Sequence, residues 1–190
     1  MCIFLLETQM RNIFTNAIFA VDQNGVMGNK EKLPWGKIKE DMQFFSSTTK
    51  NSTLIMGRKT WESPDMLRPL PNRKSIVLTT KPMNMREKYE SILNDVAFTS
   101  NTDPNFIFSL VGYSPSASEQ TERAFVIGGP SILFLFRDYT RYAYITRING
   151  EYDGDVSIDL GKYLDGFVLS GTRNLCDNAT VEEWHNETVS

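Results

Sequence analysis

Four short stretches of mainly apolar residues constrain the fold of this chain more than any other feature of its sequence. They are residues 17–22, 52–56, 75–80 and 125–127. Strands that are covered on both faces of a sheet have this continuous apolar character. Helical patterns separate the stretches, and strands that alternate with helices are typical of a largely parallel sheet. The sequence therefore predicts an α/β fold.

Further elements complete this expectation. Strand signals occur at residues 96–99, 141–148, 167–170 and 180–184, and helical patterns at 36–47, 58–63, within 81–100 and at 131–136. The C-terminal strands favour an antiparallel edge. We expect one domain with a mixed, mostly parallel central sheet of about eight strands, flanked by about four helices.

Length and composition limit the organisation of the chain and its partners. At 190 residues, one domain with a substantial core is expected. We interpret residues 1–12 as an N-terminal extension, 13–190 as the domain, and the serine-rich stretch 112–121 as a loop insertion, because strand signals resume at once after it. The net charge of −3 gives no general attraction to nucleic acid or to anionic membranes.

The cysteines and the single histidine indicate the compartment. Cys2 and Cys176 lie at opposite ends of the chain without metal or redox spacing. Free thiols in a reducing compartment fit this spacing, and so does one long-range disulfide. The apolar run at residues 2–6 is too short for a signal peptide or a membrane span. Together with the cysteines, this leads us to expect a cytoplasmic protein. His185 has no partner at ligand spacing, so we expect no metal site.

Asp41 is the acid with the most unusual predicted position. In the helix expected at 36–47, Ile38, Met42 and Phe45 recur at the spacing of one buried stripe, and Asp41 falls on its edge. A carboxylate against apolar surface must be paired, have a raised pKa or face a ligand. Trp35, six residues earlier, ends a rigid Leu-Pro-Trp corner. The alternative is an acid that only complements the helix dipole.

Two junctions in which a strand ends at glycine before a helix indicate a site for phosphate groups. They lie at residues 56–60 and 127–131. Glycine lets backbone amides approach a ligand, and a helix N-terminus suits an anion. Arg58 and Lys59 favour a phosphate monoester such as the one that separates NADP from NAD, and residues 79–80 offer hydroxyl groups nearby. Taken alone, either junction is better explained by a tight turn that needs glycine, and Arg58 with Lys59 shifts the balance toward a phosphate site at the first.

Seven motifs of this sequence, in the order in which they occur, resemble those of the dihydrofolate reductase family. They are residues 18–28, 33–35, Asp41 with Phe45, 55–63, 68–73, 126–129 and 146–148. The resemblance runs from about residue 14 to 159 and more loosely to the C-terminus. It implies the fold of that family and NADPH as the cofactor. It also implies reduction of 7,8-dihydrofolate to tetrahydrofolate, by hydride transfer to pterin C6 with protonation at N5, which supplies one-carbon metabolism and thymidylate and purine synthesis.

The same resemblance implies roles for individual residues. Asp41 resembles the acid that binds the pterin, Thr146 the hydroxyl that supports this acid, and Trp35 the ring that holds a nearby water. The residues expected at the substrate are Ile18, Met42, Phe45, Arg73 and Ile127. The residues expected at the cofactor are Ala20, Met27, Gly28, Gly57, Arg58, Lys59, Thr60, Thr79, Thr80, Gly128, Gly129, Pro130 and Ser131.

Other features of the family suggest motion and some differences. Residues 24–35 resemble a mobile loop over the nicotinamide, and Gly154 with Asp155 resembles the facing loop. Leu133 stands where a tyrosine is common, and Ser131 where an arginine often aids the adenosine phosphate. The ligands implied are dihydrofolate, folate and antifolates, bound by a cytoplasmic monomer with no nucleic-acid or membrane partner.

Two alternative functions remain open on the sequence. One is a reductase of the same fold that acts on a pyrimidine of riboflavin synthesis. Arg73, which could meet a carboxylate, and the pair of Asp41 and Phe45 favour folate over that substrate. The other is a non-catalytic folate- or nucleotide-binding protein, for which the N-terminal extension and the insertion are the only indications.

Overall fold

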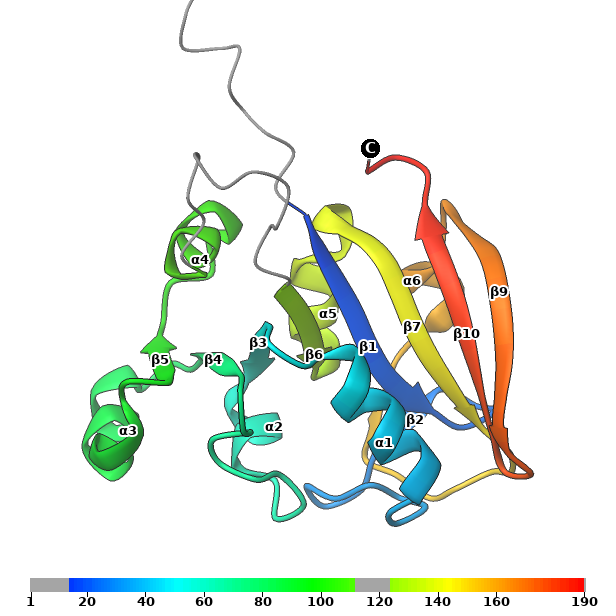
Figure 1. Cartoon of the computed structure of the whole chain (residues 1–190), viewed down its shortest axis with the longest axis horizontal. Helices are drawn as coiled ribbons and strands as arrows, with labels where there is room; N and C mark the ends of the chain where they lie inside the picture. The colour runs from blue at the N-terminus through cyan, green and yellow to red at the C-terminus, as the bar shows by residue number, and fades with distance from the viewer. Residues whose placement is uncertain (1–13, 112–123, 190) are drawn as a thin grey trace, which may run out of the picture.

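An eight-stranded sheet runs through the molecule, as Figure 1 shows. The computed structural model describes residues 14–111 and 124–189, so the predicted extension at 1–12 and the insertion at 112–121 lie outside the described residues. The strands are β1 (Thr15–Val21), β2 (Val26–Gly28), β3 (Thr53–Gly57), β4 (Lys74–Leu78), β5 (Val96–Thr99), β6 (Ala124–Gly128), β7 (Thr140–Ile148), β8 (Val156–Ser157), β9 (Phe167–Cys176) and β10 (Ala179–Asn186). The α-helices are α1 (Lys39–Thr48), α2 (Arg58–Glu62), α3 (Pro82–Lys88), α4 (Pro104–Leu110), α5 (Pro130–Leu135) and α6 (Leu160–Tyr163), with 3₁₀ turns η1 (Glu90–Ile92) and η2 (Arg137–Tyr139).

The strand order confirms the predicted mixed sheet. It is β5-β4-β3-β6-β1-β7-β10-β9. All pairs from β5 to β7 are parallel, and β10 pairs antiparallel with both β7 and β9. Because parallel strands run in one direction, the carboxyl ends of β1, β3, β4 and β6 meet at one edge of the sheet. Ligands bind at that edge in open α/β sheets.

The core lies on both faces of the sheet. Along β1, Ala17, Phe19 and Val21 join one apolar cluster, and Ile18 joins the other. The first cluster includes residues of α4, α5 and α6, and the second includes residues of α2 and α3 with partly buried rings of α1. This double coverage explains why the strands at 17–22, 52–56 and 125–127 are continuously apolar.

The structure adds short elements that the sequence pattern did not indicate. The four predicted helices correspond to α1, α2, α3 and α5, and two more are present. In α4, Asp103 accepts a hydrogen bond from Asn105 N, and in α6, Asp159 accepts one from Lys162 N. Both helices have seven residues or fewer, so a hydrophobic period cannot develop. No helix in the described part of the chain is long and apolar enough to cross a membrane.

Two segments expected to be loops contain a small second sheet. β2 pairs antiparallel with β8, within the stretches at 24–35 and 151–159. Gly25 precedes β2 with φ +81°, and its carbonyl accepts a hydrogen bond from Ile158 N at 2.9 Å. A Cβ on Gly25 would stand 2.4 Å from Ile158 O. Only glycine allows the two segments to approach so closely.

We expect Gly25→Ala to lower the free energy of unfolding by about 3 kcal/mol, because it combines a left-handed backbone with a steric clash. Gly36 is a matched control, since it has φ +76° but nothing within 4 Å of an added Cβ. Gly36→Ala should cost only about 1 kcal/mol. Urea denaturation of both variants measures the difference. Equal losses would mean that the contact with Ile158 has no part in the effect.

Candidate active site

Asp41 and Thr146 form a buried pair between α1 and the sheet. Thr146 lies on β7, opposite Ala20 of β1. Its Oγ1 donates a hydrogen bond of 2.6 Å to Asp41 Oδ1. The exposed fraction is 6% for Asp41 and 1% for Thr146. The sequence, in which 105 positions separate the two residues, placed them together only through the resemblance.

Burial changes the acidity of Asp41. It raises the pKa of this carboxyl above the ordinary 3.8, and the hydrogen bond from Thr146 opposes the rise. The carboxylate thus keeps one strong acceptor contact while its ionisation is disfavoured. Such a group can bind a ligand edge that is rich in hydrogen-bond donors.

The prediction that Ile38, Met42 and Phe45 form a buried stripe on α1 was wrong. Ile38, Met42 and Phe45 are only half-buried, and Asp41 is the buried residue of the helix. The helix begins at Lys39, with Ile38 as its N-cap, later than the pattern suggested. Part of its apolar face therefore stays accessible beside the acid. An open apolar surface next to a buried carboxyl is suited to a flat, partly polar ring.

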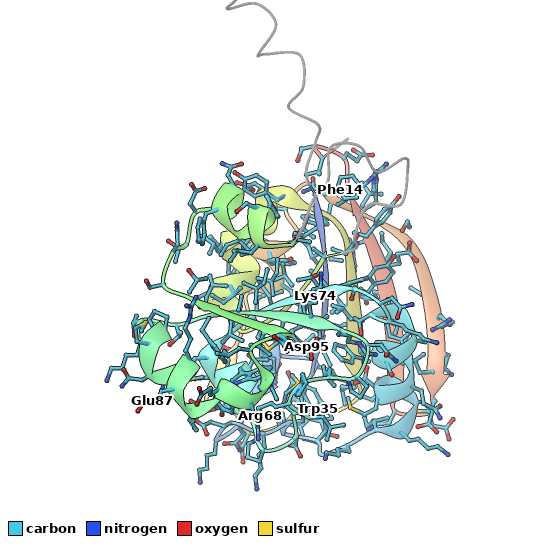
Figure 2. All side chains as sticks on the ribbon, turned by 60° about the vertical axis from the view of Figure 1, so that its left-hand side comes forward. Phe14, Trp35, Arg68, Lys74, Glu87 and Asp95 are labelled. Carbon is cyan, nitrogen blue, oxygen red and sulfur yellow. The ribbon has the colours of Figure 1, made fainter. Side chains whose placement is uncertain are left out.

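Trp35 lies at the same end of the molecule (Figure 2). Its ring meets Tyr152 edge-on, with centroids 5.7 Å apart. Its Nε1 is buried and has no hydrogen-bond partner among the described residues. A buried N–H donor without a protein partner is costly unless it meets a ligand or a water.

The two glycine junctions lie side by side. β3 and β6 are neighbours, with Met56 opposite Gly128. A Cβ on Gly128, whose φ is +121°, would stand 3.7 Å from Thr60 Oγ1 and 4.0 Å from Met27 Cε. A cis peptide joins Gly128 to Gly129, and an added Cβ on Gly129 would meet nothing within 4 Å. The junctions therefore form one cradle in which backbone is accessible to a ligand.

The remaining cofactor candidates surround this cradle at the carboxyl ends of the strands. Gly57 caps α2, and Pro130 and Ser131 open α5. Thr79, which is buried, and Thr80, which is exposed, follow β4 directly. Gly28 is the last residue of β2 and Ala20 the last but one of β1, and both are half-buried. The helices α2 and α5 have five and six residues, so their dipoles are weaker than the sequence argument assumed.

The cations at the first junction differ from each other. Arg58 pairs with Glu62 across one turn of α2 at 3.5 Å, and its side chain is half-exposed. Lys59 is exposed. Glu62 also receives Lys88 at 2.6 Å. Arg58 thus approaches a ligand with its charge partly balanced, and Lys59 offers a second cation beside it.

Arg73 is buried beside a cavity at the N-terminal ends of β3 and β4, whereas the cradle lies at their carboxyl ends. Its guanidinium donates to Thr49 O and Oγ1, Pro71 O, and Ser46 O and Oγ, over 2.6–3.2 Å. Burial lowers its pKa, and no carboxylate in the described chain pairs with it. The cavity of about 460 Å³ is lined by Asn51, Ser52, Thr53, Pro69, Leu70, Pro71, Asn72, Arg73, Lys74 and Asp95. Figure 2 looks onto this side, with Lys74 and Asp95 near its middle.

A second arginine of the motif at residues 68–73, Arg68, binds backbone carbonyl groups. Arg68 Nη1 donates to Trp61 O at 2.9 Å and to Ser63 O at 2.8 Å. These carbonyls are at the C-terminal end of α2, where such donors are commonly found. Arg68 thus stabilises the fold of its own loop. Arg73, in contrast, is a buried cation without an acid partner in the described chain, and such a cation attracts anionic ligands.

The apolar substrate candidates converge on one face of the sheet. Ile18 of β1 and Ile127 of β6 are buried in the second cluster, and Phe45 packs partly against it. Met42 is half-buried on α1. The side chains of Ile18 and Ile127 belong to the core, so the expected contact through their carbonyl groups remains a prediction.

Two residues that sequence reasoning did not place in the site organise its loops. Asp22 is fully buried, and its carboxylate accepts hydrogen bonds from Asn24 N, Val26 N and Tyr152 N at 2.8–2.9 Å. Tyr152 in turn packs on Trp35. An acid two residues before an Asn-Gly pair is the signal that could have indicated this role for Asp22.

The two segments expected to face each other do so. Asp155 N donates to Gly28 O at 3.0 Å, and Asp155 Oδ1 accepts from Lys30 N at 3.1 Å. A Cβ on Gly154 would stand 2.2 Å from Val26 Cγ1. Residues 24–35 are thus held against the loop that follows β7. We call residues 24–35 the covering segment, because Met27 reaches the cradle at Gly128.

Known proteins resemble the chain over most of its length. A model of the dihydrofolate reductase family matches residues 14–163. This chain belongs to that family. It is 34% identical over 138 residues to the dihydrofolate reductase of Bacillus subtilis (strain 168), over 73% of this chain and 71% of the relative. It is 32% identical over 168 residues to that of Saccharomyces cerevisiae (strain ATCC 204508 / S288c), over 83% and 75%. A solved structure of dihydrofolate reductase from Enterococcus faecalis, complexed with NADP(H) and RAB-propyl, has 28% identity and a TM-score of 0.71 over 93% of this chain and 98% of that one.

The match confirms the family inferred from the seven motifs. Two residues of the chain, Leu133 and Ser131, differ from those common in the family. Leu133 is fully buried in the first apolar cluster, and Ser131 is exposed at the start of α5. The first exchange therefore leaves the packing of α5 complete, and the second removes a charge at the surface only.

We expect Asp41→Asn to stabilise the folded protein, by an amount that grows with pH. Below pH 3.8, the carboxyl is protonated in both the folded and the unfolded state. As pH rises from 3.8 through the raised pKa of the folded state, the unfolded chain releases its proton first. The native protein therefore loses stability relative to the variant over this window, and the difference is constant above it.

Paired urea titrations of the native protein and Asp41→Asn between pH 4 and 8 measure this difference. Glu87→Gln, an exposed acid on α3, is the control. A difference in the free energy of unfolding that is the same at every pH would contradict a destabilising ionisation of Asp41.

Proposed function

We propose that this protein is an NADPH-dependent dihydrofolate reductase in which Asp41 binds the pterin ring of 7,8-dihydrofolate. The observation that carries the proposal is the buried Asp41–Thr146 pair beside the open face of α1. An acid in this position costs stability, and a ligand that donates hydrogen bonds to its second oxygen would recover part of that cost. The reaction is inferred from the family to which the chain belongs. It yields tetrahydrofolate for one-carbon metabolism and for thymidylate and purine synthesis.

The cradle fits the cofactor. Gly128 and Gly129 leave backbone open where a side chain would intrude, and Gly57 lies beside them. Arg58 and Lys59 suit the 2′-phosphate, and Thr60, Thr79, Thr80 and Ser131 offer hydroxyl groups. When bound, NADPH supplies the hydride for pterin C6. Ala20 lies opposite Thr146 and Met27 reaches Gly128, so both suit the region where the nicotinamide would meet the pterin.

The chemistry assigned to the protein is recognition and protonation. The Asp41 carboxylate accepts hydrogen bonds from the 2-amino group and the ring nitrogen of the pterin. Thr146 fixes one carboxylate oxygen, which leaves the other for the substrate. The free Nε1 of Trp35 suits a water that passes a proton to N5. Asp41 then orients and polarises the pterin and does not itself touch N5.

The rest of the substrate would follow the surface from α1 to Arg73. Met42 and Phe45 offer half-buried apolar surface to the pterin and the aminobenzoyl ring. Arg73, a buried cation without an acid partner in the described chain, suits the α-carboxylate of the glutamate. We infer that folate and antifolates bind here, to a cytoplasmic monomer that uses neither nucleic acid nor a membrane.

Asp41→Asn should lower kcat/KM for dihydrofolate at pH 7 by roughly 10²- to 10⁴-fold, because the acid that supports protonation is lost. NADPH binding should remain within about twofold, since no cradle residue changes. NADPH absorbance measures turnover, and quenching of the protein fluorescence by NADPH measures cofactor binding. Glu40→Gln is the matched control, because Glu40 also lies in the first turn of α1. Wild-type turnover in Asp41→Asn would refute the assignment of the acid. Equal losses in both variants would indicate that only the helix dipole matters.

Arg58→Ala should raise KM for NADPH about tenfold and leave KM for NADH nearly unchanged, because only NADPH carries the 2′-phosphate. The estimate allows for the half-exposed side chain and its existing partner Glu62. Arg86→Ala, an exposed cation on the neighbouring helix α3, controls for net charge. Steady-state assays with each cofactor give the comparison. Equal kcat/KM for NADPH and NADH in the native protein would remove the 2′-phosphate from the proposal.

A further inference from the structure

The covering segment has two adjacent residues in a backbone conformation that their side chains disfavour. Lys30 has φ 49° and Glu31 has φ 64°. They form the centre of a two-residue turn, in which Asn29 N donates to Lys32 O at 2.9 Å and Lys32 N donates to Asn29 O at 3.0 Å. Positive φ at both central residues strongly favours Asn-Gly, and Lys-Glu is therefore strained there.

The strained turn is held from outside on both of its central residues. Asp155 Oδ1 accepts a hydrogen bond from Lys30 N at 3.1 Å. Ser63 Oγ donates one to Glu31 O at 2.7 Å. The two contacts come from different parts of the fold, one after β7 and one after α2. The side chains of Lys30 and Glu31 are exposed, so packing does not hold the turn.

Ser63 is itself fixed by its surroundings. It caps the C-terminal end of α2, and its carbonyl accepts hydrogen bonds from Arg68 Nη1 at 2.8 Å and from Met66 N at 3.1 Å. Its Oγ also accepts a weak bond from Asp65 N at 3.4 Å, which directs the hydroxyl proton toward Glu31. The helix that carries Arg58 and Lys59 thus ends in a hydroxyl that holds the covering segment.

We propose that Ser63 is a positioning residue, which holds the strained turn at Lys30–Glu31 so that the covering segment stays over the cofactor cradle. Opening of the segment lets Lys30 and Glu31 return to negative φ, so the strain favours opening and the bond from Ser63 opposes it. The residence time of the nicotinamide ring is then set by the balance of the two. This inference rests on the proposed function.

The experiment compares two opposite changes in the full-length protein. Ser63→Ala removes the hydroxyl and should raise the rate of NADPH dissociation by roughly fivefold, the factor that corresponds to one ordinary hydrogen bond. Lys30→Asn with Glu31→Gly supplies the residues that the turn prefers and should lower the same rate by a similar factor. The three changes together should return the rate to near the native value.

Stopped-flow fluorescence of NADPH release from the binary complex measures these rates, and turnover with dihydrofolate is measured beside them. Ser63→Thr keeps the hydroxyl and should retain the native rate. Ser109→Ala is the matched control, because Ser109 Oγ donates a comparable bond of 2.6 Å to Phe106 O on the distant α4. A merely structural role for Ser63 would lower thermal stability without moving the two variants in opposite directions.

The outcomes separate this inference from the proposed function. Opposite shifts of the release rate that cancel on combination support it. Shifts in the same direction, or no shift in either variant while dihydrofolate is still reduced, overturn it. If Ser63→Ala fails to fold, the Lys30→Asn, Glu31→Gly variant alone decides, since an unchanged or faster release there contradicts the strain. Failure of the native protein to reduce dihydrofolate would instead count against the function proposed above.

Discussion

The parallel pairing of β1 with β7 is the interaction on which the site depends. Its register sets Ala20 opposite Thr146. On its other side β1 pairs with β6, which leads to Gly128 and Gly129. A slip of one residue in either pairing would turn the side chains to the opposite face. Thr146 would then no longer face α1, and the acid and the cradle would not share one edge of the sheet.

The acid is a point where the fold gives up stability. Asp41 is buried on a helix whose apolar neighbours are only half-buried, an inversion of the usual pattern. Thr146 offsets part of the cost of its ionisation through one short hydrogen bond. What remains is a carboxyl with a raised pKa and an unused oxygen. A site that recognises a polar ring in dry surroundings needs such a group, and stability is lost to obtain it.

The loops around the cradle follow a different physical logic. Tight contacts at Gly25 and Gly154 bring the covering segment against the loop after β7. Asp22 adds three backbone hydrogen bonds from both segments. Against these contacts stands the strain of two non-glycine residues at positive φ. The segment therefore combines many fixed contacts with strain at its tip, which is the combination that the proposed role of Ser63 requires.

The sequence by itself determined the α/β class, the positions of the main strands along the chain and the two glycine junctions that form the cradle. The spacing of apolar residues and the positions of glycine and proline determine local backbone structure, so they can be recognised in single segments. Asp41 was also apparent from the sequence, because its neighbours at helical spacing are apolar. The pairing of Asp41 with Thr146, and the family itself, came from the order of seven motifs, which local physics alone does not supply.

Only the tertiary structure decided the contacts that join distant segments. The sheet of β2 and β8 has too few residues to give a pattern, and the bond from Ser63 to Glu31 spans 32 positions. Arg68 and Arg73 are similar in sequence context, yet one holds the end of α2 and the other is buried beside a cavity. Hydrogen bonds of this kind depend on backbone positions that are set only when the whole sheet has formed. For that reason the chemistry of the site could be predicted from residue types, while its geometry and its strained loop could not.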